Sequence, residues 1–280
     1  MAIEEVKAAR PARYYLRWIV VLLVAGILAI WLGFTPDGIL GKADAVGYAV
    51  CHRIDVRSFH LGDRQLPLCA RCTGQYLGAM AGLTFQAIFG RKRAGSPPKR
   101  VIAVLVILVL AYGIDGVNSY LHLPPLLDVF PDIPRLYEPN NLLRLFTGTG
   151  MGLVLASALY PAFTSTVYRK IDQSPALPGL GAFLGMSAGA FVLAGLALTN
   201  IIWILYPLAL ISSAGVFVLL GMVYSMVVMM IFRLDNRYDR LSQAVFPLLA
   251  GLGVAILQIA LFDFGRYLLT GTWGEIPFGL

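Results

Sequence analysis

The sequence predicts an all-α, polytopic integral membrane protein, a bundle of about seven transmembrane helices. Hydrophobic residues make up 58% of the 280 residues, above the roughly 45–50% that is typical of soluble domains. Charged residues make up only 13%, and they gather in short clusters between apolar runs. Several of these runs reach the roughly 20 residues that a helix needs to cross a bilayer.

The apolar runs divide the chain into spans and regions. The expected spans cover residues 15–34, 70–90, 101–122, 142–162, 179–199, 206–231 and 244–265. We expect an N-terminal tail with the first span (1–35), a core region with an external Cys/His loop and spans two to four (36–165), and a C-terminal three-helix membrane region (175–280).

The basic clusters predict the orientation. They lie before the first span (7–17) and in alternate loops after it (91–100, 169–170 and 233–240). Lys and Arg near span ends favour the cytoplasmic side. We therefore expect the N-terminus in the cytoplasm and the C-terminus outside. The net charge of +7 is explained by these clusters, so the expected partner is the lipid bilayer and not nucleic acid.

The loop between the first two spans holds most of the reactive side chains. The stretch from Cys51 to Gly78, which runs from this loop into the second span, contains all three cysteines and two of the three histidines of the chain. Cys69 and Cys72 have the C-x-x-C spacing at which two thiolates can bind one metal ion. We expect Cys51, His52, Cys69 and Cys72 to bind zinc or a similar divalent metal. Adjacent Cys51 and His52 diverge in an extended chain, so His60 is a rival ligand.

Two other interpretations of these cysteines remain open. Cys69 and Cys72 at a helix N-terminus, beside Arg71, are also suited to thiol–disulfide exchange, because the helix dipole and a nearby cation lower a thiol pKa. Alternatively, two of the cysteines form a structural disulfide, which an external location permits.

Further polar residues are expected at the same outer side. Asp115 falls within a span, where an ionisable residue is a functional candidate by default. Asp115 and Arg144 are the candidate catalytic residues, although a plain ion pair between them is the alternative. The candidate substrate- or anion-binding residues are Arg57, Ser58, Arg71 and Asn141, because Arg matches carboxylate and phosphate geometry.

Several short motifs resemble a known family. They are Cys51-His52, Arg57-Ser58, the segment PLCARCTG (67–74), Asp115-Gly116 and the segment NLLRL (141–145). Together, over about residues 45–160, they resemble a prokaryotic membrane-protein family known as domain of unknown function 2085. The resemblance implies a multi-pass protein of a prokaryotic cytoplasmic membrane, and it supplies no activity.

The leading functional expectation is a membrane protein with a metal site at its extracytoplasmic face. This expectation extends to a metal-dependent enzyme acting on a lipid or another anionic, membrane-bound substrate. The alternatives are a membrane thiol–disulfide oxidoreductase using Cys69 and Cys72, and a structural or assembly partner or transporter subunit with a disulfide-stapled loop.

The C-terminal region carries little chemistry. Its glycines at helical spacing, Gly181, Gly185, Gly189 and Gly195, predict a packing surface between helices. Asp263 and Arg266, one turn apart, are expected to pair with each other.

Overall fold

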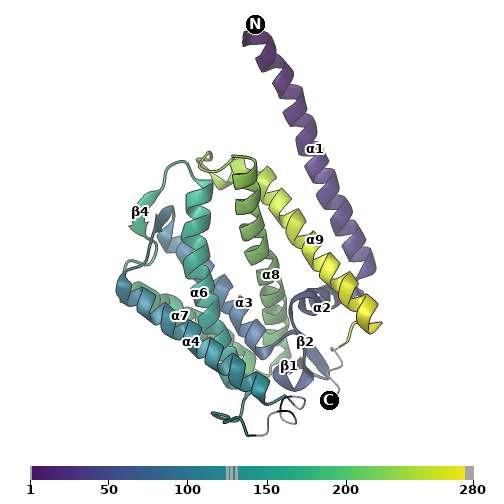
Figure 1. Ribbon diagram of the computed structural model, residues 1–280, viewed down its shortest axis with the longest axis vertical. Coiled ribbons are helices and arrows are strands. Elements are labelled where there is room, and N and C mark those ends of the chain that lie inside the picture. The colour runs from purple at the N-terminus through teal and green to yellow at the C-terminus, as the bar shows by residue number, and fades with distance from the viewer. Residues whose placement is uncertain (1, 124–125, 127–128, 130–131, 275–280) are drawn as a thin grey trace.

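Long helices run between the two ends of the molecule (Figure 1). The computed structural model describes residues 2–123, 126, 129 and 132–274, with side chains described from residue 17 onward. The helices of the bundle are α1 (Ala2–Phe34), α3 (Ala70–Phe85), α4 (Lys99–Leu121), α6 (Asn141–Val167), α7 (Leu180–Gly195), α8 (Ile202–Ile231) and α9 (Val245–Thr270).

Among the described residues, six helical segments are long and apolar enough to cross a membrane. This confirms the predicted polytopic helical membrane protein. The expected second span, 70–90, has a different form. There α3 is a 16-residue helix followed by a π-helical turn, η2 (Gln86–Gly90), and it is not among the six.

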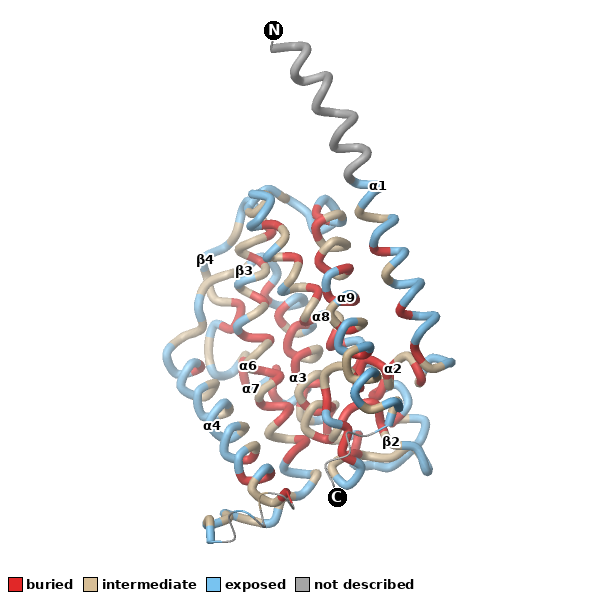
Figure 2. Tube along the Cα trace, turned by 45° about the vertical axis from the view of Figure 1, so that its right-hand side comes forward, coloured by how far each residue is buried: buried red, intermediate tan, exposed pale blue. Residues whose placement is uncertain are grey.

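The helices differ in how far the protein itself covers them. Half of the residues in the apolar segment of α6 are buried inside the chain, against 17% for α4 and 11% for α1. Figure 2 shows the same contrast, with buried positions concentrated along α3, α6 and α8 and with α1 largely exposed. Helices α3, α6 and α8 therefore form the centre, and α1 and α4 lie at the periphery.

Glycines let α3 and α6 approach each other closely. A Cβ atom at Gly74 would overlap the carbonyl oxygen of Leu145, and one at Gly148 would overlap that of Arg71. Gly78 and Gly152, one turn further along each helix, meet the partner backbone in the same way. Both helices thus carry the small-xxx-small spacing that permits close helix packing. This contact aligns the N-terminal ends of α3 and α6.

A short helix and a hairpin cover one end of the bundle. Helix α2 (Gly38–Val50) leads into a 3-10 turn, η1 (Asp55–Arg57), and then into the antiparallel strands β1 (Ser58–Leu61) and β2 (Arg64–Cys69). Gly47 lies so close to β2 that a Cβ atom there would overlap the carbonyl oxygen of Pro67. This end carries the cysteine-rich loop (Figure 1).

Three short loops meet at the opposite end. Strand β3 (Arg93–Gly95) pairs in parallel with β4 (Asp172–Pro175), and a β-bridge joins Tyr168 to Tyr238. The Lys92 ammonium group also donates to the carbonyl oxygen of Asp239. The chain also has two further 3-10 turns, η3 (Leu196–Thr199) and η4 (Leu241–Ala244).

The glycines of α7 make no close contact within the described part of the chain, so the predicted packing surface stays a prediction for contacts with another molecule. A Cβ atom added at Gly181, Gly189 or Gly195 meets nothing within 4 Å among the described residues, and one at Gly185 reaches only the Phe85 ring, at 4.0 Å. Close glycine-mediated helix contacts occur instead between α3 and α6 and, at Gly251, between α9 and α8.

Candidate functional site

The three cysteine sulfurs form one cluster. The Sγ atoms of Cys51, Cys69 and Cys72 all lie within 4.8 Å of one another. All three thiols are free. Cys51 comes from the end of α2, Cys69 from the end of β2, and Cys72 from the first turn of α3. Three elements that are separate in sequence therefore converge at one point.

A tight turn after α2 directs two backbone amides at the Cys51 sulfur. Arg53 adopts a left-handed conformation with φ of 54°, so the chain reverses direction just after Cys51. The backbone N–H groups of Arg53 and Cys69 each donate to Cys51 Sγ at 3.4 Å. Hydrogen bonds to a charged group favour its charged form, so this arrangement suits a sulfur that carries negative charge.

Cys69 occupies the N-cap of α3, with extended backbone angles. The positive end of the helix dipole favours an anion at this position. Hydrogen bonding with the Cys51 and Cys72 thiols lowers the pKa of Cys69 well below its usual range, and the Arg71 charge acts in the same direction. Hydrogen bonding with Cys69 and burial raise the pKa of Cys51 to about 12. Without a cation, the cluster therefore concentrates its negative charge on Cys69.

The surroundings of the cluster are apolar. Cys51 is buried in a hydrophobic group that includes Trp31, Leu68 and Ile256, and Cys69 and Cys72 pack against the same group. Such surroundings offer little solvation to several thiolates, so a metal cation is the natural counter-charge. Neutral, buried thiols are the other state that this setting allows, since free cysteine behaves as a small hydrophobe.

Neither histidine of the loop belongs to the cluster. The exposed His52 ring makes an edge contact with Tyr120, its centroid 6.2 Å from that of Tyr120. The His60 ring lies 2.8 Å from a carboxylate oxygen of Asp55 on the hairpin. Among the described residues, the compact ligand group therefore consists of the three cysteines.

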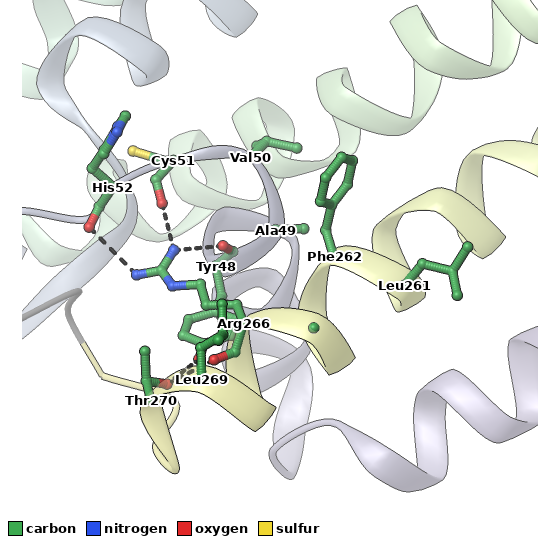
Figure 3. A pocket seen from close by; sticks show the side chains of 11 residues that line it. Tyr48, Ala49, Val50, Cys51, His52, Leu261, Phe262, Arg266, Leu269 and Thr270 are labelled. Carbon is green, nitrogen blue, oxygen red and sulfur yellow. Dashed lines mark hydrogen bonds between the residues drawn. The ribbon is translucent and has the colours of Figure 1, made fainter.

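Arg266 on α9 holds the backbone at Cys51, and the sequence did not reveal this role. Its guanidinium group donates to the carbonyl oxygens of Tyr48 (2.6 Å) and Cys51 (2.8 Å), and it stacks over the Tyr48 ring (Figure 3). A cation at the C-terminal carbonyls of α2 also complements the helix dipole. The expected Asp263–Arg266 pair is absent from the ion pairs of the described residues. Asp263 instead accepts a hydrogen bond from the Trp31 indole at 2.9 Å.

Asp115 and Arg71 form a buried ion pair across α3 and α4. Arg71 Nε donates to Asp115 Oδ2 at 3.1 Å, and an Arg71 terminal nitrogen also donates to the Ser119 hydroxyl at 2.9 Å. The hydroxyls of Tyr137 and Thr147 donate to the two Asp115 carboxylate oxygens at 2.9 and 3.1 Å. Asp115 is thus the partner of Arg71 and not of Arg144, and both of its oxygens already accept hydrogen bonds.

The other candidate anion-binding residues lie beside this pair. Arg57 donates to the carbonyl oxygen of Ser119 at 2.9 Å, and Arg144 donates to the Asn141 amide oxygen at 2.9 Å. Burial lowers the pKa of Arg57, and the nearby Arg71 charge lowers it further. Ser58 is different, because its hydroxyl donates to the Ile54 carbonyl and accepts from the Gln65 amide within the hairpin.

Comparison with known proteins covers the segment that carries these groups. The family model described as "Predicted membrane protein (DUF2085)" matches residues 51–158, from Cys51 into α6. An uncharacterized protein of Methanothermobacter thermautotrophicus is 32% identical over 107 residues, which cover 38% of this chain and 81% of that protein.

A second uncharacterized protein, from Methanocaldococcus jannaschii, is 25% identical over 126 residues, which cover 45% of this chain and 71% of that protein. No solved structure matches the chain. The family match begins at the cysteine-rich loop and agrees with the resemblance seen in the motifs. The chain belongs to the DUF2085 family of predicted membrane proteins.

Proposed function

We propose that this membrane protein binds zinc or a similar divalent metal ion through Cys51, Cys69 and Cys72. The observation that carries the proposal is the convergence of the three sulfurs within 4.8 Å of one another. Thiolates are ligands for borderline-soft ions such as Zn²⁺. The two backbone amides that donate to Cys51 Sγ support a thiolate at that position, because they stabilise its charge.

Three cysteines leave one position of a tetrahedral ion to be filled. Structural zinc sites fill it with a fourth protein ligand, whereas catalytic sites keep it for water or substrate. His52 and His60 are the candidates for the structural form. The catalytic form of the proposal is a metal-dependent enzyme that acts on a lipid or another membrane-bound substrate.

The proposal includes the orientation expected from the sequence, with seven crossings and the metal site on the extracytoplasmic side. Its support is that the expected cytoplasmic loops contact one another. Asp172 N–H donates to the carbonyl oxygen of Lys92, and Arg169 N–H donates to that of Tyr238. The basic clusters thus share the end of the bundle opposite the cysteines, as the positive-inside rule requires of cytoplasmic loops.

Elemental analysis of the purified, detergent-solubilised chain tests the metal site. We expect the wild type to retain about one equivalent of zinc per chain and the Cys69→Ser/Cys72→Ser variant to retain almost none, because each lost thiolate removes a ligand. Replacement of the metal by Co²⁺ would give thiolate-to-cobalt absorption in the wild type alone. Equal, near-zero metal in both proteins after purification in zinc-supplemented buffer would overturn the proposal.

The fourth ligand is decided by two matched variants, His52→Ala and His60→Ala. If one histidine completes the site, its variant loses metal and the other retains it. If both variants keep the wild-type metal content and Co²⁺ spectrum, the fourth position belongs to water or a substrate.

A thiol–disulfide oxidoreductase is the second candidate function. The specific observation that favours it is Cys69 at the N-cap of α3 with a lowered pKa, because a low-pKa thiolate is the attacking group in thiol exchange. Cys72 or Cys51 would then resolve the mixed disulfide. Mass analysis after thiol alkylation under reducing and oxidising buffers tests this candidate. Cysteines that label identically in both buffers would exclude it.

A further inference from the structure

Three arginines lie near the cysteine cluster, and the negative groups around them are too few to balance their three positive charges. Arg57, Arg71 and Arg144 lie within electrostatic range of one another. The carboxylate of Asp115 interacts electrostatically with both Arg57 and Arg144, and Cys69 is a second group that does so when it is negatively charged. Asp115 is already paired with Arg71. Among the described residues, neither Arg57 nor Arg144 forms an ion pair.

Asn141 links the Arg144 side chain to the backbone on either side of Arg57. Its amide oxygen accepts from Arg144 at 2.9 Å, and its amide nitrogen donates to the carbonyl oxygens of Val56 and Ser58, at 3.3 and 3.4 Å. Val56 and Ser58 flank Arg57. Asn141 therefore connects the Arg144 guanidinium group on α6 to the backbone of η1 around Arg57.

Arg144 is buried without enough acceptors. The residue is only 7% exposed, and its Nε atom has no hydrogen-bond partner in the described part of the chain. An unsatisfied buried donor destabilises the folded chain, and more so when it is charged. A guanidinium group offers five N–H donors. A bound anion would supply the missing acceptors and also the missing negative charge.

The position of the two arginines indicates what kind of anion fits. Asn140 is the N-cap of α6, so the positive end of that helix dipole adds to the two charges. Two guanidinium forks from different elements match the several oxygens of a phosphate, whereas a carboxylate offers only two oxygens in one plane. The neighbouring Val56 and Leu142 side chains are 77% and 46% exposed, as expected beside lipid.

We propose that Arg57 and Arg144 bind the phosphate group of an anionic ligand at the N-terminal end of α6. Asn141 positions the two guanidinium groups, and Asp115 holds Arg71 away from the ligand. The source of the phosphate is a lipid head group at the membrane surface or a free phosphate compound. The site does not depend on the proposed metal, because none of its contacts involves a cysteine sulfur.

Native mass spectrometry of the full chain in detergent tests the site with two lipids that differ only in the phosphate. Phosphatidic acid is the probe, and diacylglycerol is its phosphate-free counterpart. We expect the wild type to retain phosphatidic acid at least about tenfold better than diacylglycerol. We expect Arg57→Gln and Arg144→Gln each to lose about tenfold in this retention, as removal of a charged hydrogen-bonding partner predicts.

Arg64→Gln is the matched control. Arg64 lies on the same hairpin and is exposed, but it pairs with Asp44, so its loss changes the net charge equally without touching the site. We expect phosphatidic acid retention within about twofold of the wild type for this control, since exposed ion pairs contribute little. If Arg144→Gln does not fold, Arg57→Gln alone decides, because Arg57 is only partly buried.

A third arm distinguishes the two sources of phosphate. If inorganic phosphate raises the unfolding temperature of the wild type but not of Arg57→Gln, and the two lipids bind alike, the ligand is a free phosphate compound. If phosphatidic acid raises the unfolding temperature of the wild type but not of Arg57→Gln, and inorganic phosphate raises neither, the ligand is a lipid head group. The proposal fails if neither probe distinguishes the wild type from Arg57→Gln, or if Arg64→Gln loses as much binding as Arg57→Gln.

Discussion

Two glycine-rich helix faces of this protein have the same sequence spacing and opposite surroundings. On α3 and α6, a Cβ atom at Gly74, Gly78, Gly148 or Gly152 would overlap the backbone of the other helix. On α7, a Cβ atom at Gly181 or Gly189 would have no atom of the described residues within 4 Å. Spacing alone therefore does not identify the packed face.

Buried polar contacts distinguish the packed pair from the open face. Beside the α3–α6 contact, Asp115 of α4 pairs with Arg71 of α3 and accepts hydrogen bonds from Thr147 of α6 and from Tyr137. In a membrane there is no hydrophobic drive between helices, so close packing and interhelical hydrogen bonds supply the association. Helices α3 and α6 pack closely and are also linked through Asp115, whereas the glycines of α7 have no close contact among the described residues. The candidate site is built where both are present.

The largest expected effect comes from breaking the Arg71–Asp115 ion pair, which joins α3 to α4 beside the α3–α6 contact. Asp115→Asn leaves the buried Arg71 charge without its carboxylate, and breaking a buried pair by removing one partner costs about 3–5 kcal/mol. We expect a loss of that order in the free energy of unfolding, measured by titration of mixed micelles with sodium dodecyl sulfate.

The double variant Arg71→Gln/Asp115→Asn provides the control. It removes both charges, so we expect it to be more stable than Asp115→Asn alone. If Asp115→Asn unfolds at the wild-type denaturant fraction, the ion pair does not stabilise the α3–α6 end, and the contrast with α7 would rest on glycine packing alone.

A smaller effect is expected at the glycines themselves. In Gly148→Ala, the added methyl group meets the Arg71 carbonyl oxygen, so α3 and α6 must separate. Overpacking of this kind costs about 1–3 kcal/mol. The separation also moves α3 relative to α6, so we expect lower zinc retention than in the wild type under the same purification. The free energy of unfolding and the metal content of the same preparation are the two measurements. Wild-type values of both would show that the helices can repack around a methyl group.

The sequence predicts the membrane-spanning character of this chain well, because it follows from composition and run length. It also predicts the convergence of Cys69 and Cys72, which C-x-x-C spacing at a helix start makes local. Cys51 joins them through the close contact of α2 with β2, where a Cβ atom at Gly47 would overlap the Pro67 carbonyl oxygen. No local pattern encodes that contact.

Pairings between distant residues are the part that the sequence leaves open. Arg144 was the expected ion-pair partner of Asp115, whereas the structure pairs Asp115 with Arg71, which faces α4 from the first turn of α3. Arg266 was expected to pair with its helical neighbour Asp263, yet it binds backbone carbonyls of α2. Both cases depend on which helices are neighbours, and hydrophobic spans of similar length do not specify their neighbours.

The smallest effect is expected on the open face and has the opposite sign. Gly189→Ala adds a methyl group that has no atom of the described residues within 4 Å. Alanine is favoured over glycine in a helix interior by about 0.5–1 kcal/mol, so we expect a gain of that order in the free energy of unfolding, with unchanged zinc retention. The substitution is the same as in Gly148→Ala, so surroundings are the only difference between the two variants. A loss of stability in Gly189→Ala would mean that this face of α7 packs closely against another molecule in the purified protein. Both glycine faces would then be closely packed, and they would differ only in whether the packing partner belongs to the same chain.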